Sequence, residues 1–353
     1  MKNILLLLFV FAITCYASAC TTFFINKNGQ MVFGRNYDWI TGNGMVCSNQ
    51  RGLFKKSAAT KEGKAISWIS LYGSITFNQY GKEFPTGGMN EKGLVVELMW
   101  LNETKYPVAD NRAAMGTLQW IQYQLDNCST VDELIATDSD IRIASAGTEP
   151  LHYLVADATG KAATIEFLNG KMVVHTGKEL PFPVLTNSVY ASSLQQSGVT
   201  SNNKSSNSFQ DNSIERFAKA CKLVKEYQVG GNQPVVDYSF NILNEVAQGS
   251  HTKWSIVYDI TNKKIHFRTN GFPEIKNVSF SALDLSCKAA SKSLELNQHV
   301  TGDIASLFKN YNIEMNKKIV EKSFDESSSE IRANKEEIRD TWEYATTITC
   351  KKE

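Results

Sequence analysis

Two short runs at the start of the chain have the composition of β-strands. Residues 21–25 and 31–35 are rich in apolar and β-branched side chains, and Asn28 and Gly29 lie between them. An Asn-Gly pair tolerates the positive φ angles of a tight hairpin turn. The pattern therefore predicts a β-hairpin whose first strand begins directly after Cys20.

Further apolar runs predict a set of strands joined mainly by hairpins. Residues 93–101 are apolar apart from Glu97. The other predicted strands are a meander at 151–156, 162–167 and 171–175, and a hairpin at 253–260 and 265–269. Several of these runs are apolar at both odd and even positions, which is typical of sheets covered on both faces.

Helices that would cover these sheets have recognisable signals. Thr130 and Glu133 have the spacing of a capping box, Ser213 is placed to cap a helix with an apolar stripe, and residues 235–248 predict a third helix. Strands arranged as hairpins between helices favour two packed sheets between helical layers. We therefore expect an α+β fold with mostly antiparallel sheets.

The chain divides into three parts by composition. Residues 1–19 precede the first strand, 20–295 contain the predicted strands and helices, and 296–353 form a polar, helix-prone C-terminal extension. Within the central part, residues 192–213 are rich in Ser, Asn and Gln and predict an exposed, mobile loop.

The first nineteen residues have the features of a secretory signal peptide. Lys2 is followed by an apolar run over 4–13, which is too short to cross a bilayer, and then by Ala17, Ser18 and Ala19. A buried N-terminal strand or helix is the alternative. We expect cleavage after Ala19, a secreted or periplasmic mature chain, and no stable membrane anchor.

Cleavage after Ala19 would make Cys20 the first residue, with a free α-amine beside its thiol. The reference pKa of such an amine is about 7.7–8.0, so it can act as a base for its own side chain. Two other fates remain open, because an exported N-terminal cysteine is also a candidate for lipidation or for a disulfide. The mature chain would hold six cysteines, whose pairing stays open: Cys20, Cys47, Cys128, Cys221, Cys287 and Cys350.

Composition and missing motifs exclude several function classes. The 353 residues include 37 Lys and Arg against 36 Asp and Glu, a balance that argues against binding to nucleic acid or to an anionic membrane surface. The sequence has no GxSxG, HExxH, P-loop or CxxC motif, and no GxGxxG after a strand. We therefore expect no metal and no nucleotide cofactor.

Five blocks, in order along the chain, carry a resemblance to a known family. They are residues 20–22 with 33–39, 88–94, 183–188, 214–217 and 254–268. Together they resemble the choloylglycine hydrolase and penicillin V acylase family, whose members are N-terminal-nucleophile amidases. The resemblance implies a four-layer αββα fold, hydrolysis of a linear amide in a small molecule, and a possible homotetramer.

The same resemblance assigns roles to three residues near the N-terminus. Cys20 is similar to the nucleophile, Arg35 to the cation that favours its thiolate, and Asp38 to the carboxylate that holds the α-amine. The spacing between Cys20 and Arg35 is one residue shorter than is usual in the family. Taken alone, Arg35 also fits a solvated strand end, and Asp38 a turn.

Further assignments concern the oxyanion and the substrate. Asn187 resembles the side chain that stabilises the oxyanion, the backbone N–H of Trp100 the second donor, and Arg216 a distal catalytic arginine. Alone, Asn187 also fits a turn and Arg216 a surface position. The side chains of Met99 and Trp100 are expected at the substrate.

Trp100 bears on the choice of substrate. The resemblance associates an aromatic residue there with penicillin V acylases, and an indole favours a flat or apolar acyl group. We therefore expect penicillin V-type or fatty-acyl amides, including N-acyl homoserine lactones. The alternatives are a bile salt hydrolase and a catalytically dead secreted or lipid-anchored binding protein.

Overall fold

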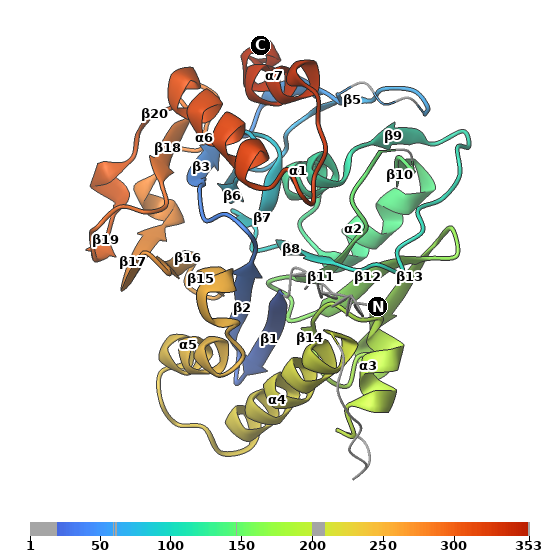
Figure 1. The fold of residues 1–353 in the computed structure, drawn as a ribbon. Coiled ribbons are helices and arrows are strands. Elements are labelled where there is room, and N and C mark those ends of the chain that lie inside the picture. Colours follow the sequence, from blue (N-terminus) through green and yellow to red (C-terminus); the bar gives the residue numbers. More distant parts are fainter. Residues whose placement is uncertain (1–19, 59, 61, 146, 200–208, 352–353) are drawn as a thin grey trace, which may run out of the picture.

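The computed structural model describes residues 20–351, apart from 59, 61, 146 and 200–208. The predicted signal peptide, residues 1–19, lies outside the described residues. Two large sheets stack between layers of helices, as Figure 1 shows. This arrangement confirms the predicted α+β fold of the αββα type.

The first sheet contains the strand that follows Cys20. Its order is β14-β1-β2-β15-β16-β17-β19, and all pairings except β17 with β19 are antiparallel. The strands are β14 (Val184–Leu185), β1 (Thr21–Lys27), β2 (Gln30–Asp38), β15 (Thr252–Asp259), β16 (Lys264–Thr269), β17 (Phe272–Ser279) and β19 (Gly302–Asp303).

The second sheet is wholly antiparallel, with the order β13-β12-β11-β8-β7-β6-β3-β18-β20. Its strands are β13 (Lys171–Thr176), β12 (Ala162–Leu168), β11 (Leu151–Ala156), β8 (Val95–Trp100), β7 (Pro85–Asn90), β6 (Ser74–Asn78), β3 (Met45–Asn49), β18 (Lys292–Glu295) and β20 (Lys309–Asn310). Two small sheets pair β9 (Ala113–Met115) with β10 (Ile141–Ile143), and β4 (Leu53–Lys56) with β5 (Ser67–Ile69) and β21 (Thr349–Cys350).

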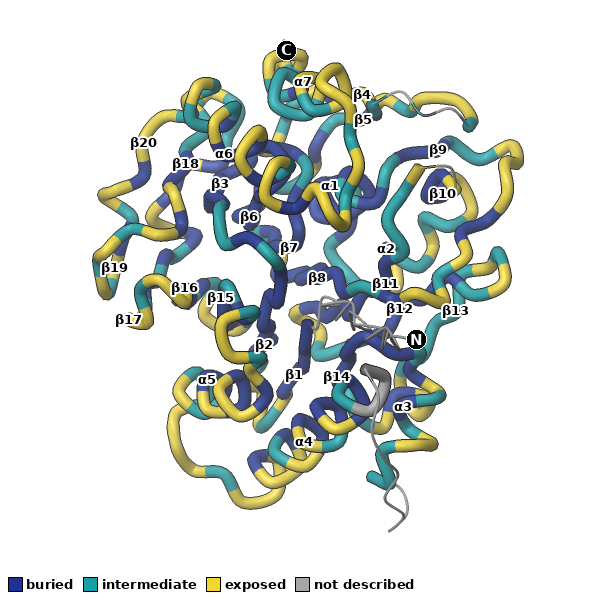
Figure 2. The backbone as a smooth tube through the Cα atoms, viewed as in Figure 1, coloured by how far each residue is buried: buried dark blue, intermediate teal, exposed yellow. Residues whose placement is uncertain are grey.

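Helices cover the outer face of each sheet. The helix α4 (Phe209–Gly230) packs on β1, and α5 (Val235–Glu245) packs on β2 and β15, whereas α1 (Thr117–Asn127) packs on β7 and β8. The remaining α-helices are α2 (Val131–Ala136), α3 (Tyr190–Gln196), α6 (Ile313–Glu326) and α7 (Lys335–Glu343). Figure 2 shows buried strands in the centre and exposed outer faces on α4 to α7.

Local predictions for turns and helix ends have mixed outcomes. Asn28 and Gly29 both have positive φ, 53° and 81°, so the predicted hairpin turn is confirmed. The prediction that Ser213 caps a helix is wrong, because α4 begins at Phe209. Residues 192–213 are also not one loop: α3 continues to Gln196 and α4 starts at Phe209, while 200–208 lie outside the described residues.

The segment from residue 296 onward does more than add two helices. Its strand β20 extends the second sheet, β19 extends the first, and β21 pairs with β4. A disulfide joins Cys287 to Cys350, whereas Cys20, Cys47, Cys128 and Cys221 are free thiols. The C-terminal segment is therefore tied into the same layers as the rest of the protein.

Candidate active site

Cys20 lies immediately before β1, and the hairpin brings two charged residues of β2 to it. Its thiol is 3.9 Å from Nη2 of Arg35 and 3.8 Å from the main-chain oxygen of Asp38. Only 2% of Cys20 is exposed. Burial raises the pKa of the thiol, and the charge of Arg35 opposes that rise. The cationic side chain thus favours the thiolate at this position.

Arg35 is held by two buried groups. Its Nη1 donates to the main-chain oxygen of Thr86 at 2.8 Å and forms an ion pair with Glu97, which also accepts a hydrogen bond from Tyr258. The carboxylate of Glu97 lies directly over Gly87, where a Cβ would come within 2.0 Å of it. Glu97 therefore serves as the counter-ion that permits an arginine to be buried beside the thiol.

Asp38 is fully buried and only half satisfied. One oxygen, Oδ1, accepts a hydrogen bond from Thr252, while Oδ2 has no donor among the described residues. Burial raises the pKa of Asp38 to about 7, although Arg216 and Thr252 act in the opposite direction. A buried carboxylate oxygen without a donor has room for one more cationic or N–H partner.

Arg216 joins three parts of the site. From α4 it reaches the main-chain oxygen of Cys20 and the hydroxyl of Thr21, both at 2.6 Å, and the side-chain oxygen of Asn187 at 3.0 Å. The side chain is buried, so it is not the surface arginine that its position off the apolar stripe suggests. It fixes the N-terminal end of β1 relative to Asn187.

Asn187 and Trp100 place backbone and side-chain donors side by side. The side-chain amide of Asn187 donates to the main-chain oxygen of Trp100 at 2.9 Å. Trp100 pairs with Leu151 across the sheet, and the next pair carries the hydrogen bond from Leu101 N–H to Pro150. Hydrogen-bonded and non-hydrogen-bonded pairs alternate along an antiparallel ladder, so Trp100 and Leu151 form a non-hydrogen-bonded pair. The N–H of Trp100 therefore points away from β11, on the same side as its carbonyl group.

A buried histidine fixes the residue before Asn187. His152 Nε2 lies 2.7 Å from the main-chain oxygen of Thr186 and, because that oxygen only accepts, Nε2 donates. The Nδ1 of the same ring lies 3.2 Å from Glu166, which also accepts from the N–H of Tyr190. Thus β11 and β12 hold the chain segment that carries Asn187.

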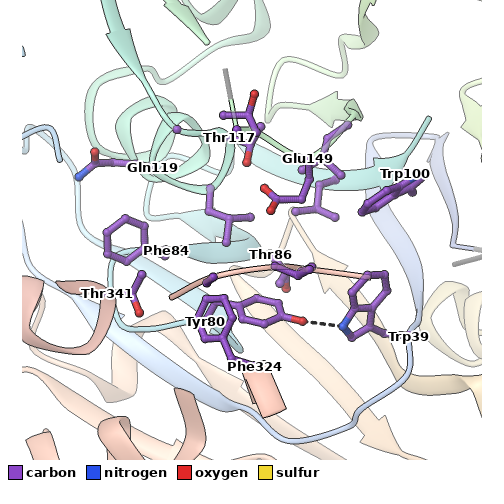
Figure 3. A pocket seen from close by; sticks show the side chains of 18 of the residues that line it. Trp39, Tyr80, Phe84, Thr86, Trp100, Thr117, Gln119, Glu149, Phe324 and Thr341 are labelled. Atoms are coloured by element: carbon purple, nitrogen blue, oxygen red, sulfur yellow. Dashed lines mark hydrogen bonds between the residues drawn. The ribbon is translucent and has the colours of Figure 1, made fainter. Parts of the chain in front are cut away.

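An apolar cavity of about 380 Å³ opens beside Cys20. Figure 3 shows Trp39 and Trp100 at one side of it and Phe84, Gln119 and Thr341 at the other. The two indole rings stack with centroids 6.0 Å apart. Polar side chains on the lining are Thr86, Thr117, Gln119, Thr148, Glu149, Arg332, Glu337 and Thr341. The cavity suits a mainly apolar ligand.

The structure brings six of the seven candidate site residues together around the thiol: Cys20, Arg35, Asp38, Trp100, Asn187 and Arg216. Met99 is the exception. It lies on the opposite face of β8 from Trp100, is fully buried, accepts a hydrogen bond from Thr22 at 3.3 Å and is not part of the cavity lining. This follows from the alternation of side chains along a strand.

Sequence reasoning missed several supporting groups: Glu97, Thr252, Thr21 and the His152–Glu166 pair. Of these groups, only Glu97 could have been recognised from the sequence. It is a single carboxylate in an otherwise apolar strand, and such a buried charge needs a buried partner. The others are ordinary strand residues until the sheets are assembled.

Metal ions have no evident place among the described residues, since these contain no group of three or more His, Cys, Asp or Glu side chains arranged to hold one. Within the same part of the chain, no helix has both the length and the apolar character needed to cross a bilayer.

Comparison with known families decides where this site belongs. The sequence profile described as linear amide C–N hydrolases, choloylglycine hydrolase family, matches residues 20–232, which is more than half of the chain. The chain belongs to the choloylglycine hydrolase family. The match begins at Cys20, the residue on which the candidate site is centred.

Individual relatives within the choloylglycine hydrolase family agree with this assignment. Penicillin V acylase of Pectobacterium atrosepticum is 33% identical over 144 residues, which is 35% of this chain and spans about a third (36%) of the relative's length. The structure of penicillin V acylase from Agrobacterium tumefaciens superposes with a TM-score of 0.70 at 27% identity, over 83% of this chain and 98% of that chain.

A bile acid hydrolase shares the fold. A variant of conjugated bile acid hydrolase from Clostridium perfringens superposes with a TM-score of 0.65 at 18% identity, over 80% of this chain and 98% of that chain. The similarity to both kinds of structure confirms the αββα architecture.

Proposed function

We propose that this protein is an exported cysteine amidase that hydrolyses linear N-acyl amides, with Cys20 as the nucleophile. The observation that carries the proposal is the position of one buried thiol. It lines an apolar cavity, lies 3.9 Å from the guanidinium of Arg35, and is next to Asp38, whose Oδ2 has no donor among the described residues.

Cleavage after Ala19 would complete this arrangement. The new α-ammonium group at Cys20 would be a natural partner for the free oxygen of Asp38, and it would hold the pKa of that carboxyl down. The signal-like segment supports export, and so does the disulfide between Cys287 and Cys350, because disulfides persist in oxidising compartments.

The reaction would proceed through a thioester. The α-amine takes the thiol proton of Cys20, and the thiolate sulfur bonds to the amide carbonyl carbon. The N–H of Trp100 and the side-chain amide of Asn187 stabilise the negative oxygen. The α-ammonium then gives its proton to the leaving nitrogen as the C–N bond breaks. A water molecule, deprotonated by the same amine, cleaves the thioester and restores the thiol.

The acyl group is expected to be aromatic or a fatty chain. Trp39 and Trp100 stack beside the thiol and offer flat apolar faces, and similarity to two penicillin V acylases points in the same direction. Phenoxyacetyl amides and fatty-acyl amides are therefore the favoured substrates. Bile salt conjugates are the competing class that the assay must include.

Intact mass of the secreted protein, before and after incubation with a phenoxyacetyl amide and rapid acid quench, tests the proposal. We expect a mature chain that starts at unmodified Cys20 and gains the acyl mass on turnover. Cys20→Ala should fold and show no turnover, and a mature chain that retains Ala19 should also be inactive because its nitrogen is an amide. Turnover by Cys20→Ala, or a lipidated N-terminus, would overturn the proposal.

A further inference from the structure

The cavity beside Cys20 is built from two distant parts of the chain. Trp39 lies on the wall nearest the thiol, because it follows Asp38, whose main-chain oxygen contacts Cys20. A second wall includes Phe324 and Ile331, which belong to α6 and to the segment after it. This second wall lies beyond residue 232, where the match to the family profile ends.

Contacts with Tyr80 fix the position of Phe324. The ring of Phe324 packs edge-on against Tyr80 with centroids 4.9 Å apart, and the hydroxyl of Tyr80 donates to Ser327 at 3.0 Å. The same hydroxyl accepts a hydrogen bond from the indole of Trp39 at 2.6 Å, as Figure 3 shows. The two walls are therefore connected through a single tyrosine.

A second set of contacts seats α6 and α7 on the loop between β6 and β7. The side-chain oxygen of Asn316 accepts from the N–H of Lys82 at 3.1 Å, and its amide donates to the main-chain oxygen of Trp342 at 3.0 Å. Phe84, which lines the cavity, packs against Tyr344 with centroids 5.1 Å apart. The C-terminal wall is thus a fixed part of the fold.

The wall presents two apolar side chains to the cavity, Phe324 and Ile331, beside the polar Arg332, Glu337 and Thr341. Phe324 and Ile331 are both only partly buried although they pack against the hydrophobic core, so part of each side chain faces the cavity. At about 380 Å³ the cavity lies near the lower end of the roughly 300–1,000 Å³ range of ligand pockets. Such a space suits a short aromatic or medium-length acyl group better than a large rigid one.

We infer that Phe324 and Ile331 are specificity-determining residues that limit the length of the acyl group. The inference rests on the proposed function, because that function places the amide carbonyl group at Cys20. From there the acyl tail passes Trp39 and Trp100 and ends against Phe324 and Ile331. A segment outside the family match therefore selects the substrate.

Substitutions of Phe324 in both directions test this inference. The preference is measured as the ratio of kcat/KM for a dodecanoyl amide to that for a hexanoyl amide with the same leaving amine. Phe324→Ala should raise the ratio about 10-fold, because contacts with a few methylene groups change discrimination by that order. Phe324→Trp should lower it, since the larger ring shortens the cavity. Ile331→Ala should shift it in the same direction as Phe324→Ala.

Ile338→Ala provides a matched control, since Ile338 lies in the same segment but does not line this cavity. Its ratio should stay within about twofold of the unsubstituted enzyme, a difference well below what one methylene contact contributes. A ratio that is unchanged in all three wall variants, or that moves equally in Ile338→Ala, would overturn the inference. Circular dichroism of each variant excludes general misfolding as the cause.

Binding separates this inference from the proposed function. Calorimetric titration of Cys20→Ala with dodecanoate and hexanoate, with and without Phe324→Ala, measures chain-length preference without turnover. If the enzyme hydrolyses no acyl amide, the proposed function is refuted. A shifted binding preference would still support the role of Phe324 in limiting the length of the acyl group. Unchanged binding preference together with unchanged chain-length kinetics would refute the role of Phe324 and Ile331 in chain-length selection. The proposed amidase activity would not be affected by that result.

Discussion

The side-chain amide of Asn187 donates a hydrogen bond to the main-chain oxygen of Trp100 across 2.9 Å. The carbonyl oxygen of the Asn187 side chain accepts from Arg216 at 3.0 Å, which fixes the orientation of the amide group. Its NH2 group has two hydrogens, and only one is used by Trp100. In the proposed function, the second hydrogen meets the carbonyl oxygen of the substrate.

Asn187→Ala should therefore lower kcat by about 10²–10³ with little change in KM, because the lost donor acts on the developing oxyanion and not on the bound amide. Steady-state kinetics with the best acyl amide measure both constants. Asn262→Ala, on a turn of the first sheet and outside the cavity lining, is the control and should leave kcat unchanged. A rise in KM with kcat unchanged would show that Asn187 only binds substrate.

Glu97→Gln should lower the free energy of unfolding by about 3–5 kcal/mol, since it leaves Arg35 as a buried cation without its counter-ion. Urea denaturation at neutral pH measures the change. Glu321→Gln is the control: it makes the same change from carboxylate to amide, but at an exposed position. It should change the free energy of unfolding by less than about 0.5 kcal/mol. A similar small loss at Glu97 would mean that other groups compensate the charge of Arg35.

The sequence pattern was sufficient for the core elements and for the residues whose chemistry is visible in a motif. Apolar runs without alternation correctly indicated sheets covered on both sides, and the Asn28–Gly29 pair correctly predicted the hairpin. The pairing of Arg35 with Thr22 in that hairpin came from the structure. The sequence pattern did not predict which strands become neighbours in the sheets. The neighbours of β2 include β15, more than 200 residues further along the chain, and Thr252 of that strand reaches Asp38.

The wrong prediction at Ser213 has a physical cause, and the contacts of the C-terminal extension were hidden for a similar reason. Ser213 has the residue type of a helix cap, but its hydroxyl instead accepts the N–H of Asn187 at 3.0 Å and donates to Thr186. The C-terminal extension, residues 296–353, has a mainly polar composition, which gave no indication of contacts with the cavity. Its few apolar side chains, such as Phe324, form a cavity wall that only tertiary contacts reveal.

Removing the disulfide should loosen the C-terminal segment. Cys287 and Cys350 are 63 residues apart, and closing a loop of that length reduces the entropy of the unfolded chain by an amount equivalent to about 4 kcal/mol. Cys350→Ser should therefore lower the melting temperature. A reducing agent should lower it similarly in the unsubstituted protein and have no effect in Cys287→Ser/Cys350→Ser. An effect of reductant that persists in this double variant would implicate another cysteine.

The stability of the uncleaved chain should fall as pH rises towards neutrality because of Asp38. Burial raises the pKa of this carboxyl from an ordinary value of 3.8 to about 7, so the folded state binds a proton that the unfolded chain has already lost. The contribution of protonated Asp38 to the free energy of unfolding is fully present below pH 4 and is lost between pH 4 and pH 7. The change amounts to about 4 kcal/mol. Asp38→Asn should remove that slope, as urea denaturation across this range would measure. In the mature chain, the α-ammonium of Cys20 should lower the pKa of Asp38 and flatten the slope. An equal slope in both chains would show that the amine does not reach Asp38.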